Sequence, residues 1–441
     1  MSSPRLNCGL ITLCILLSCR IVEAQANYTG PGPATFGSPT TTGPGATPAL
    51  IALPATGANA PSGLGGFIQR KFYTITADLR ETYDDNANTT TNGNKTSALE
   101  TSLSPSVLVD FPIGDSDFTA RYTFNLTYYS AGGNGNSSND PSVQYTHEFD
   151  AQYSHTFSER FSLSLGDDFR YYTEPNIFQS TGTNYNNGPY ASNIFNGSFS
   201  AQWTPLIGSS TTYSNTVVNY ENSAIAQVQN SDENTGSQSV SFAILPKISV
   251  SVGGIFDQID YSQNARGYTS YTGFGGAQWQ ALPTLSVSGR LGASYTEQAQ
   301  TQQSAQLSPY GDLSIAWALG ARSSLAFDYS HEVTPTDQPN ENAQNSDRFS
   351  SSFSYAITPR LSSHLDGTFT IADTSQDLAV SGAPNSSAHT EYDYGLDTGL
   401  TFQYNNYLNF EGGVTVTGVS SDITGDAYNR DQVYLGVRGT Y

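Results

Sequence analysis

Histidines are the residues of this sequence best suited to acid–base or metal chemistry, and there are 5 of them. A catalytic or metal-binding histidine needs a serine, a carboxylate or a second histidine at a spacing that brings the side chains together. The arrangement most similar to a catalytic pair is His331 beside Glu332. Because His331 lies on an apolar stripe, we interpret it instead as an interfacial residue that acts like an aromatic side chain. The others are His147 on an apolar stripe, His155 and His364 near expected turns, and His389 beside an expected loop.

Sequence motifs of catalysis or cofactor binding are missing as well. There is no Gly-x-Ser-x-Gly, no His-Glu-x-x-His and no phosphate-binding glycine loop, and the glycines of 273–276 are typical of close strand packing. We therefore predict no catalytic residue, no cofactor and no metal site. The function must then depend on the secondary-structure elements that carry these side chains.

The N-terminus has the features of a secretory signal. Arg5 precedes an apolar run from Leu10 to Leu17, and Ala24-Gln25-Ala26 offers a cleavage site, so we expect a signal peptide over 1–26. Cleavage near Ala26 would remove all three cysteines, which are Cys8, Cys14 and Cys19. The run Leu16-Leu17-Ser18-Cys19 resembles a bacterial lipobox, so lipidation at Cys19 stays open as an alternative.

Composition favours an all-β protein that does not bind nucleic acid. Only 12% of the 441 residues are charged, while Tyr reaches 28, Phe 22 and Gly 41. Aromatic and glycine enrichment suits strands that turn tightly. The formal net charge of -21 opposes phosphate binding, which needs Lys and Arg.

The chain divides into a linker and a long region of alternating polarity. Residues 27–69 are rich in Gly, Pro and Thr, which is typical of a flexible linker. From 70 to 441, runs of ten to fifteen residues alternate between apolar and polar positions, which is the period of a strand. The clearest run, Phe118 to Tyr128, is apolar on one face and polar on the other, whereas Ile255-Phe256 breaks the alternation as a bulge would.

Gap lengths between these runs alternate between short and long. Short turns at Pro205, Pro246, Pro283 and Pro359 are interleaved with longer gaps, of which one is expected over Asn222 to Gly236. Short periplasmic turns and long external loops are typical of an outer-membrane barrel. The sequence thus predicts a single transmembrane antiparallel β-barrel over 70–441 with about 18 strands, 16 being the alternative.

Aromatic residues indicate the two membrane interfaces. Trp203, Trp279 and Trp317 each stand a few residues before a short turn on the apolar phase, and Tyr441 ends the last strand. We expect these four in a girdle at the periplasmic rim, and we expect the strand ending at Tyr441 to pair with the first strand and close the barrel.

The polar phase of the strands predicts the residues that line the lumen. Acidic candidates are Asp78, Glu100, Asp110, Glu148, Asp150, Asp168, Asp312, Asp328, Asp366, Asp393 and Asp397; basic ones are Arg80, Arg121, Arg170, Arg290 and Arg438. Carboxylates that line a pore favour cations and neutral polar solutes over anions. The alternative is that these carboxylates only keep the lumen hydrated.

The strand-turn-strand repeats around Pro246, Pro283 and Pro359 and the terminal Tyr441 resemble those of the β-barrel porins of Gram-negative bacteria, in particular the second of two broad families. The resemblance covers about Arg70 to Tyr441. It implies an outer-membrane location, a C-terminal strand read by the barrel-assembly machinery and, in some members, association with polysaccharide export. It supplies no catalytic residues.

Two classes of function follow from these expectations. The first is a porin-like channel for passive diffusion of small hydrophilic solutes, with membrane lipid and those solutes as partners. The second is a barrel without a channel that serves polysaccharide export or envelope assembly, and an outer-membrane hydrolase is a more distant alternative. The sequence leaves the oligomeric state open.

Overall fold

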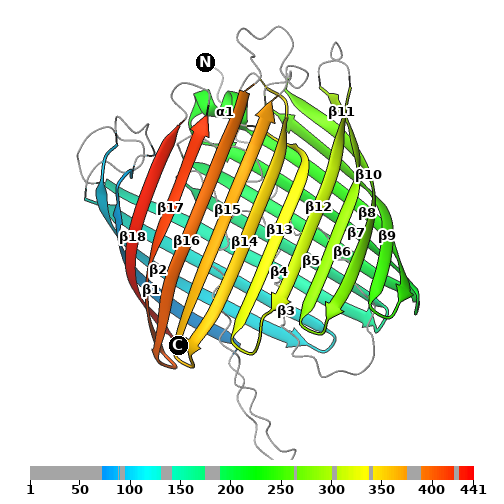
Figure 1. Cartoon of the computed structure of the whole chain (residues 1–441). Coiled ribbons are helices and arrows are strands. Elements are labelled where there is room, and N and C mark those ends of the chain that lie inside the picture. The colour runs from blue at the N-terminus through cyan, green and yellow to red at the C-terminus, as the bar shows by residue number, and fades with distance from the viewer. Residues whose placement is uncertain are drawn as a thin grey trace, which may run out of the picture.

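A computed structural model describes residues 72–87, 89, 95–130, 142–173, 189–262, 266–299, 305–336, 341–374, 389–421 and 427–441. The predicted signal peptide, the lipobox and the predicted linker lie outside these residues. The strands are β1 Tyr73–Asp84, β2 Ala98–Ile113, β3 Ser116–Tyr129, β4 Ser142–Ser158, β5 Phe161–Tyr172, β6 Tyr190–Thr204, β7 Ile207–Tyr220, β8 Ser231–Leu245, β9 Ile248–Tyr261, β10 Gly267–Leu282, β11 Leu285–Gln298, β12 Gln306–Ala318, β13 Ser323–Thr334, β14 Gln344–Thr358, β15 Leu361–Thr374, β16 His389–Asn405, β17 Leu408–Ser421 and β18 Tyr428–Thr440. One short helix, α1 Ser223–Gln229, lies between β7 and β8 (Figure 1).

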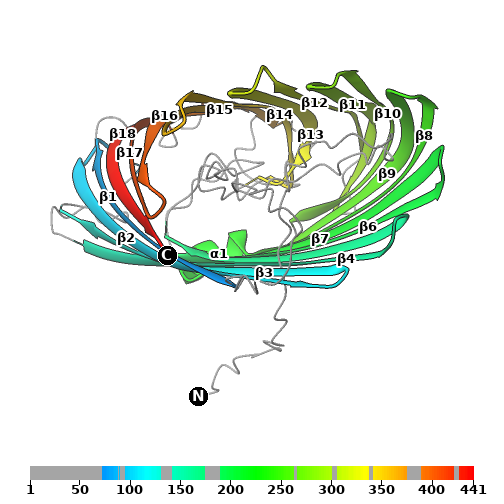
Figure 2. The same cartoon turned by 90° about the horizontal axis from the view of Figure 1, so that it is seen from below.

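All 18 strands belong to one antiparallel sheet in which each strand pairs with its neighbours along the chain. The sheet closes on itself because β1 pairs with β18 as well as with β2. At the end of this seam Tyr441 N donates to Ile75 O at 2.8 Å and Ile75 N donates to Tyr441 O at 3.0 Å. The end view shows the resulting ring of strands (Figure 2). The predicted closure and strand number are confirmed.

Alternation decides which side chains point outward. On β1, Tyr73, Ile75 and Leu79 are 46%, 44% and 48% exposed, whereas the intervening residues are partly buried inside the ring. In a bilayer, outward apolar side chains meet lipid tails, and a closed ladder leaves no backbone edge without a hydrogen-bonding partner. Polar residues therefore gather on the inner face.

Tight turns join the strands at one end of the barrel. Pro205, Pro246, Pro283 and Pro359 each follow a strand directly, where a residue without an N–H costs no ladder bond. The register shifts just before these turns, between Gln280 and Leu282 for example, as a bulge at a barrel rim does.

Two local expectations are wrong. Residues 222–236 do not form one long loop, because Asn222 caps α1 by accepting from Ala224 N at 3.0 Å and β8 already begins at Ser231. No bulge occurs at Ile255, since the pairing of β9 with β8 and β10 runs through it without a shift. Its apolar side chain simply takes an inward position. Among the described residues, no helix is both long and apolar enough to span a bilayer.

Candidate functional site

The inner wall of the barrel brings together the charged side chains of the strands. The register places on inward positions all of the predicted lining residues, namely Asp78, Glu100, Asp110, Arg121, Glu148, Asp150, Arg170, Arg290, Asp312, Asp328, Asp366, Asp393 and Asp397, as well as Arg80, Asp168 and Arg438. Whether they line a conducting pore stays a prediction.

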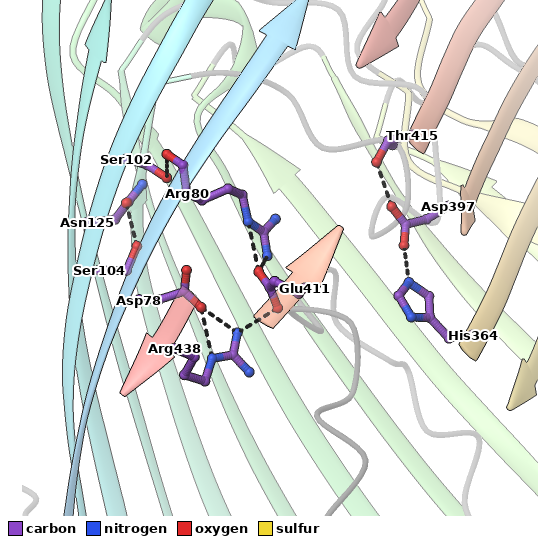
Figure 3. Close-up of polar contacts among 10 residues, drawn as sticks. All are labelled: Asp78, Arg80, Ser102, Ser104, Asn125, His364, Asp397, Glu411, Thr415 and Arg438. Carbon is purple, nitrogen blue, oxygen red and sulfur yellow. Dashed lines mark hydrogen bonds and ion pairs between the residues drawn. The ribbon is translucent and has the colours of Figure 1, made fainter. Parts of the chain in front are cut away.

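A group of ion pairs lies inside the seam between the two ends of the sheet. Asp78 and Arg80 from β1, Glu411 from β17 and Arg438 from β18 form this seam cluster (Figure 3). Arg80 Nε donates to Glu411 Oε1 at 3.1 Å, and Arg438 Nε donates to Asp78 Oδ2 at 2.8 Å. Arg438 also lies 3.6 Å from Glu411, so each arginine contacts at least one carboxylate.

Glycine makes the pair of Arg80 and Glu411 possible. Gly436 on β18 stands between them, directly opposite both in the two ladders. A Cβ there would lie 2.9 Å from Glu411 Oε1. The side chains therefore meet across a strand that offers no side chain of its own.

A second group continues the seam cluster along the wall. His364 Nε2 lies 2.6 Å from Asp397 Oδ1, and Thr415 Oγ1 donates to Asp397 Oδ2 at 2.5 Å (Figure 3). Asp366 stands opposite Asp397 in the ladder. One ligand atom from each of His364, Asp366 and Asp397 lies within 4.8 Å of the others. Among the described residues this is the group that could hold a metal ion, and the sequence search did not predict it.

Tyr434 joins the two groups. Its ring lies beneath the Arg80 guanidinium, 4.5 Å from centroid to Cζ, as in a cation–π contact. Its hydroxyl occupies space that only glycine leaves free, because a Cβ at Gly413 would lie 2.5 Å from that oxygen and one at Gly399 would lie 2.8 Å from it.

Two further ion-pair groups lie elsewhere on the inner wall. On β4 and β5, Arg170 binds Asp168 and lies 3.7 Å from Asp150. In the same group, Tyr172 donates to Glu148 at 2.8 Å. Arg121 on β3 stands opposite Asp150 in the ladder. Arg170 is thus held against two carboxylates.

The other of these two further groups lies on β10 to β12. Arg290 Nε donates to Asp312 Oδ2 at 2.7 Å, and Tyr310 OH donates to the same oxygen at 3.0 Å. The guanidinium also lies 5.0 Å from the Phe274 ring centroid. Aromatic faces and a carboxylate together fix the position of this cation.

Several inward charged residues were not predicted from the sequence. Glu411 is followed by Gly412 and Gly413, which hide the alternation of β17. Asp84 ends β1 and accepts from Arg430 Nε at 2.5 Å. The same Arg430 lies 3.5 Å from the predicted residue Glu100. Asp110 and Asp328 are inward but stand in other parts of the ring.

His331 and Glu332 cannot act as a pair, because adjacent strand residues point to opposite faces. His331 is outward, where its Nδ1 lies 2.9 Å from Asp347 Oδ1, and Glu332 is inward. His147 is also outward, and its Nδ1 lies 2.8 Å from Tyr122 OH. An interfacial role for these histidines remains the better reading.

The four predicted girdle residues share one end of the barrel. Trp203, Trp279 and Trp317 are 56%, 50% and 39% exposed, point outward and precede the short turns. Tyr441 is 63% exposed at the same end, where the chain terminates (Figure 1). Their contact with a membrane interface stays a prediction.

Among known proteins, the chain is similar to several solved structures. No family model matches the sequence, and no curated protein matches it. The barrel is similar to OccAB3 of Acinetobacter baumannii, with 10% identity and a TM-score of 0.42 over 84% of this chain and 99% of that one. It is similar to the outer membrane protein opdK of Pseudomonas aeruginosa, with 12% identity and a TM-score of 0.44 over 85% and 100%. OccK2 (OpdF) of Pseudomonas aeruginosa, solved in complex with glucuronate, has 10% identity and a TM-score of 0.42 over 85% and 100%.

The class of protein follows from the barrel itself. A closed antiparallel ring with outward apolar side chains and inward charges is the architecture of an outer-membrane β-barrel. The chain is such a barrel and resides in the cell outer membrane.

Proposed function

We propose that this protein is a porin-like channel through which small hydrophilic solutes diffuse passively, and that its lumen favours cations and neutral solutes over anions. The observation that carries the proposal is the balance of charge on the inward positions of the strands. The same proposal places the chain among the β-barrel porins that its turns and C-terminus resemble.

Among the described residues, inward carboxylates outnumber inward arginines by more than two to one. The arginines are Arg80, Arg121, Arg170, Arg290, Arg348, Arg430 and Arg438; the carboxylates are Asp78, Asp84, Glu100, Asp110, Asp117, Glu148, Asp150, Asp168, Glu233, Asp257, Asp312, Asp328, Glu332, Asp366, Glu391, Asp393, Asp397 and Glu411. Only some of these carboxylates are paired with an arginine. The net negative potential of the others attracts cations and repels anions.

Barrel size supports diffusion. A ring of 18 strands falls in the range in which side chains no longer fill the interior and leave an aqueous channel. An amino acid or a small sugar would then cross without a dedicated binding step, and His364 with Asp366 and Asp397 would give a cation a favourable position along the wall.

A barrel without a channel that serves polysaccharide export or envelope assembly is the second candidate. The resemblance described above suggests it, and a lumen closed to small solutes would favour it. A hydrolase has less support, since His331 and Glu332 point to opposite faces.

Swelling of liposomes that contain the purified barrel tests the proposal. We expect rapid entry of a small neutral sugar and of lysine, and slower entry of glutamate, which is similar in size but anionic. Swelling no faster than that of protein-free liposomes for all three solutes would refute the channel, and faster entry of glutamate than of lysine would refute the charge preference.

A further inference from the structure

The outer surface of the barrel carries a group of polar side chains on one wall, some near mid-strand and two, Asn193 and Asn234, three residues from a strand end. On most strands the outward mid-strand residues are large and apolar, such as Leu291, Leu396 and Leu435, which are 76%, 44% and 70% exposed. On β5 to β8 the outward residues instead include Asp167, Asn193, Thr211, Asn215, Asn234 and Gln238, here called the polar belt. These four strands form one continuous wall of the ring (Figure 2).

Asp167 is the most unusual member of the belt. Every other outward carboxylate in the described strands lies within three residues of the strand end beside a long loop; these are Glu81, Asp232, Asp260, Glu297, Asp347, Asp373 and Asp431. Asp167 stands at the middle of β5, far from both rims of the barrel. A carboxylate facing hydrocarbon at that depth is costly, because lipid tails offer it no hydrogen bond.

Belt residues satisfy only part of their own hydrogen-bonding capacity. Asn193 Nδ2 donates to Asp167 Oδ1 at 3.0 Å, and Asn215 Nδ2 donates to Asn234 Oδ1 at 3.1 Å. Thr211 Oγ1 donates to Gln238 Oε1. Among the described residues, Asp167 Oδ2 has no donor, so lipid leaves this oxygen unsatisfied.

The wall that carries the belt has outward glycines beside exposed aromatic residues. Gly197 on β6 and Gly236 on β8 stand on either side of Tyr213 on β7, and Gly273 lies on β10. A Cβ added at Gly236 or Gly273 would meet no atom within 4 Å. A side chain of a second barrel could therefore fill the space over these glycines and exclude lipid from the polar side chains.

We propose that the polar belt is the contact through which two copies of this chain form a two-fold dimer in the membrane. The occupant must be embedded in lipid and must offer both donors and acceptors at the same depth. The belt itself meets that requirement, since its amides and hydroxyl do both.

Symmetry pairs the acidic end of one belt with the amide end of the other. In a two-fold contact the same patch meets itself in reversed order. An axis along the membrane normal between β6 and β7 sets β5 against β8 of the second copy. Asp167 and Gln238 both stand at the middle of their strands, so Asp167 meets the partner's Gln238 at equal height, and that amide supplies the donor that Asp167 Oδ2 lacks.

Cross-linking in intact outer membranes tests the contact. Gly197 lies outward near the proposed axis, and a Cβ there would be 3.5 Å from its nearest neighbour, so Gly197→Cys fits without strain. With Cys8, Cys14 and Cys19 replaced by serine, we expect this variant to form a disulfide-linked dimer on mild oxidation. The matched control is Leu396→Cys, which is outward at mid-strand on β16, on the opposite wall (Figure 2), and should stay monomeric.

Native mass spectrometry of the full chain in lipid nanodiscs completes the test. We expect wild type at twice the chain mass, and Asp167→Leu/Asn215→Leu/Gln238→Leu as a single barrel that keeps its heat-resistant migration on gels. Wild-type monomers without a Gly197→Cys cross-link would overturn the proposal, and so would trimers, which need two different surfaces instead of one self-complementary belt. Neither result depends on whether the barrel conducts.

Discussion

At the scale of residues, the inner wall is organised by arginines that each face more than one partner. Arg80 binds Glu411 and lies on the Tyr434 ring, and Arg438 contacts both Asp78 and Glu411. Such contacts hold long side chains against the wall. Removing one charge from such a group changes the potential in the lumen without removing bulk.

Neutralising Asp78 should weaken the preference for cations. A unit charge about 10 Å from an ion in water stabilises a cation and destabilises an anion by about 0.4 kcal/mol each, so Asp78→Asn should lower the cation-to-anion permeability ratio about fourfold at low salt. Glu81→Gln is the matched control, because Glu81 lies on the same strand but points outward. Reversal potentials of both variants in a salt gradient make the comparison, and equal effects would show that the inward position of Asp78 is irrelevant.

Glycine at 413 should be essential for packing of the inner wall. A Cβ there would collide with Thr398 O and with the Tyr434 hydroxyl, so Gly413→Ala should destabilise the barrel by about 1 to 3 kcal/mol. Gly273→Ala is the control, since its Cβ meets no atom within 4 Å. Thermal unfolding followed by gel mobility measures both, and a Gly413→Ala barrel as stable as the control would contradict the tight contact.

At the scale of elements, the seam between β1 and β18 depends on a buried ion pair. The Asp84 side chain is 0% exposed and accepts from Arg430 and from Gln432 Nε2, the latter at 2.8 Å. A buried carboxylate that loses its partner is strongly destabilising.

Arg430→Met should therefore loosen the seam and cost about 3 to 5 kcal/mol of stability. Adding Asp84→Asn should restore part of the loss, because the uncompensated charge disappears. Arg160→Met, in an exposed turn, serves as the control. Unfolding in urea compares the variants, and an Arg430→Met barrel no less stable than the control would show that the pair contributes nothing to closure.

Strand number and closure could be predicted from the sequence because alternation has a period of two and the turns carry proline. The inward position of residues such as Asp150 and Asp397 follows from the same alternation of inward and outward residues along a strand. Partners could not be predicted, since Arg80 and Glu411 lie 331 positions apart and meet only through the closed register. Residues 231–236 were expected in a loop because Asp232 and Asn234 make the outward face of this part of β8 polar as well, and Asn234 belongs to the belt.

At the scale of the whole molecule, the inner and outer faces of the barrel carry different charged residues. Within the described strands every arginine points inward, whereas outward carboxylates stay near the long loops except for Asp167. Apart from the polar belt, the ring therefore separates a mainly apolar exterior from an acidic interior. Passive, cation-favouring diffusion is the function that this arrangement supports.

The sign of the reversal potential of single wild-type channels tests this account most directly. The purified full-length chain is inserted into a planar bilayer that separates dilute from tenfold more concentrated KCl. We predict stepwise conductance and a reversal potential at which the dilute side must be held positive to stop the current, because K⁺ crosses faster than Cl⁻. A reversal potential of the opposite sign, or a bilayer that stays silent although the barrel has inserted, would contradict it.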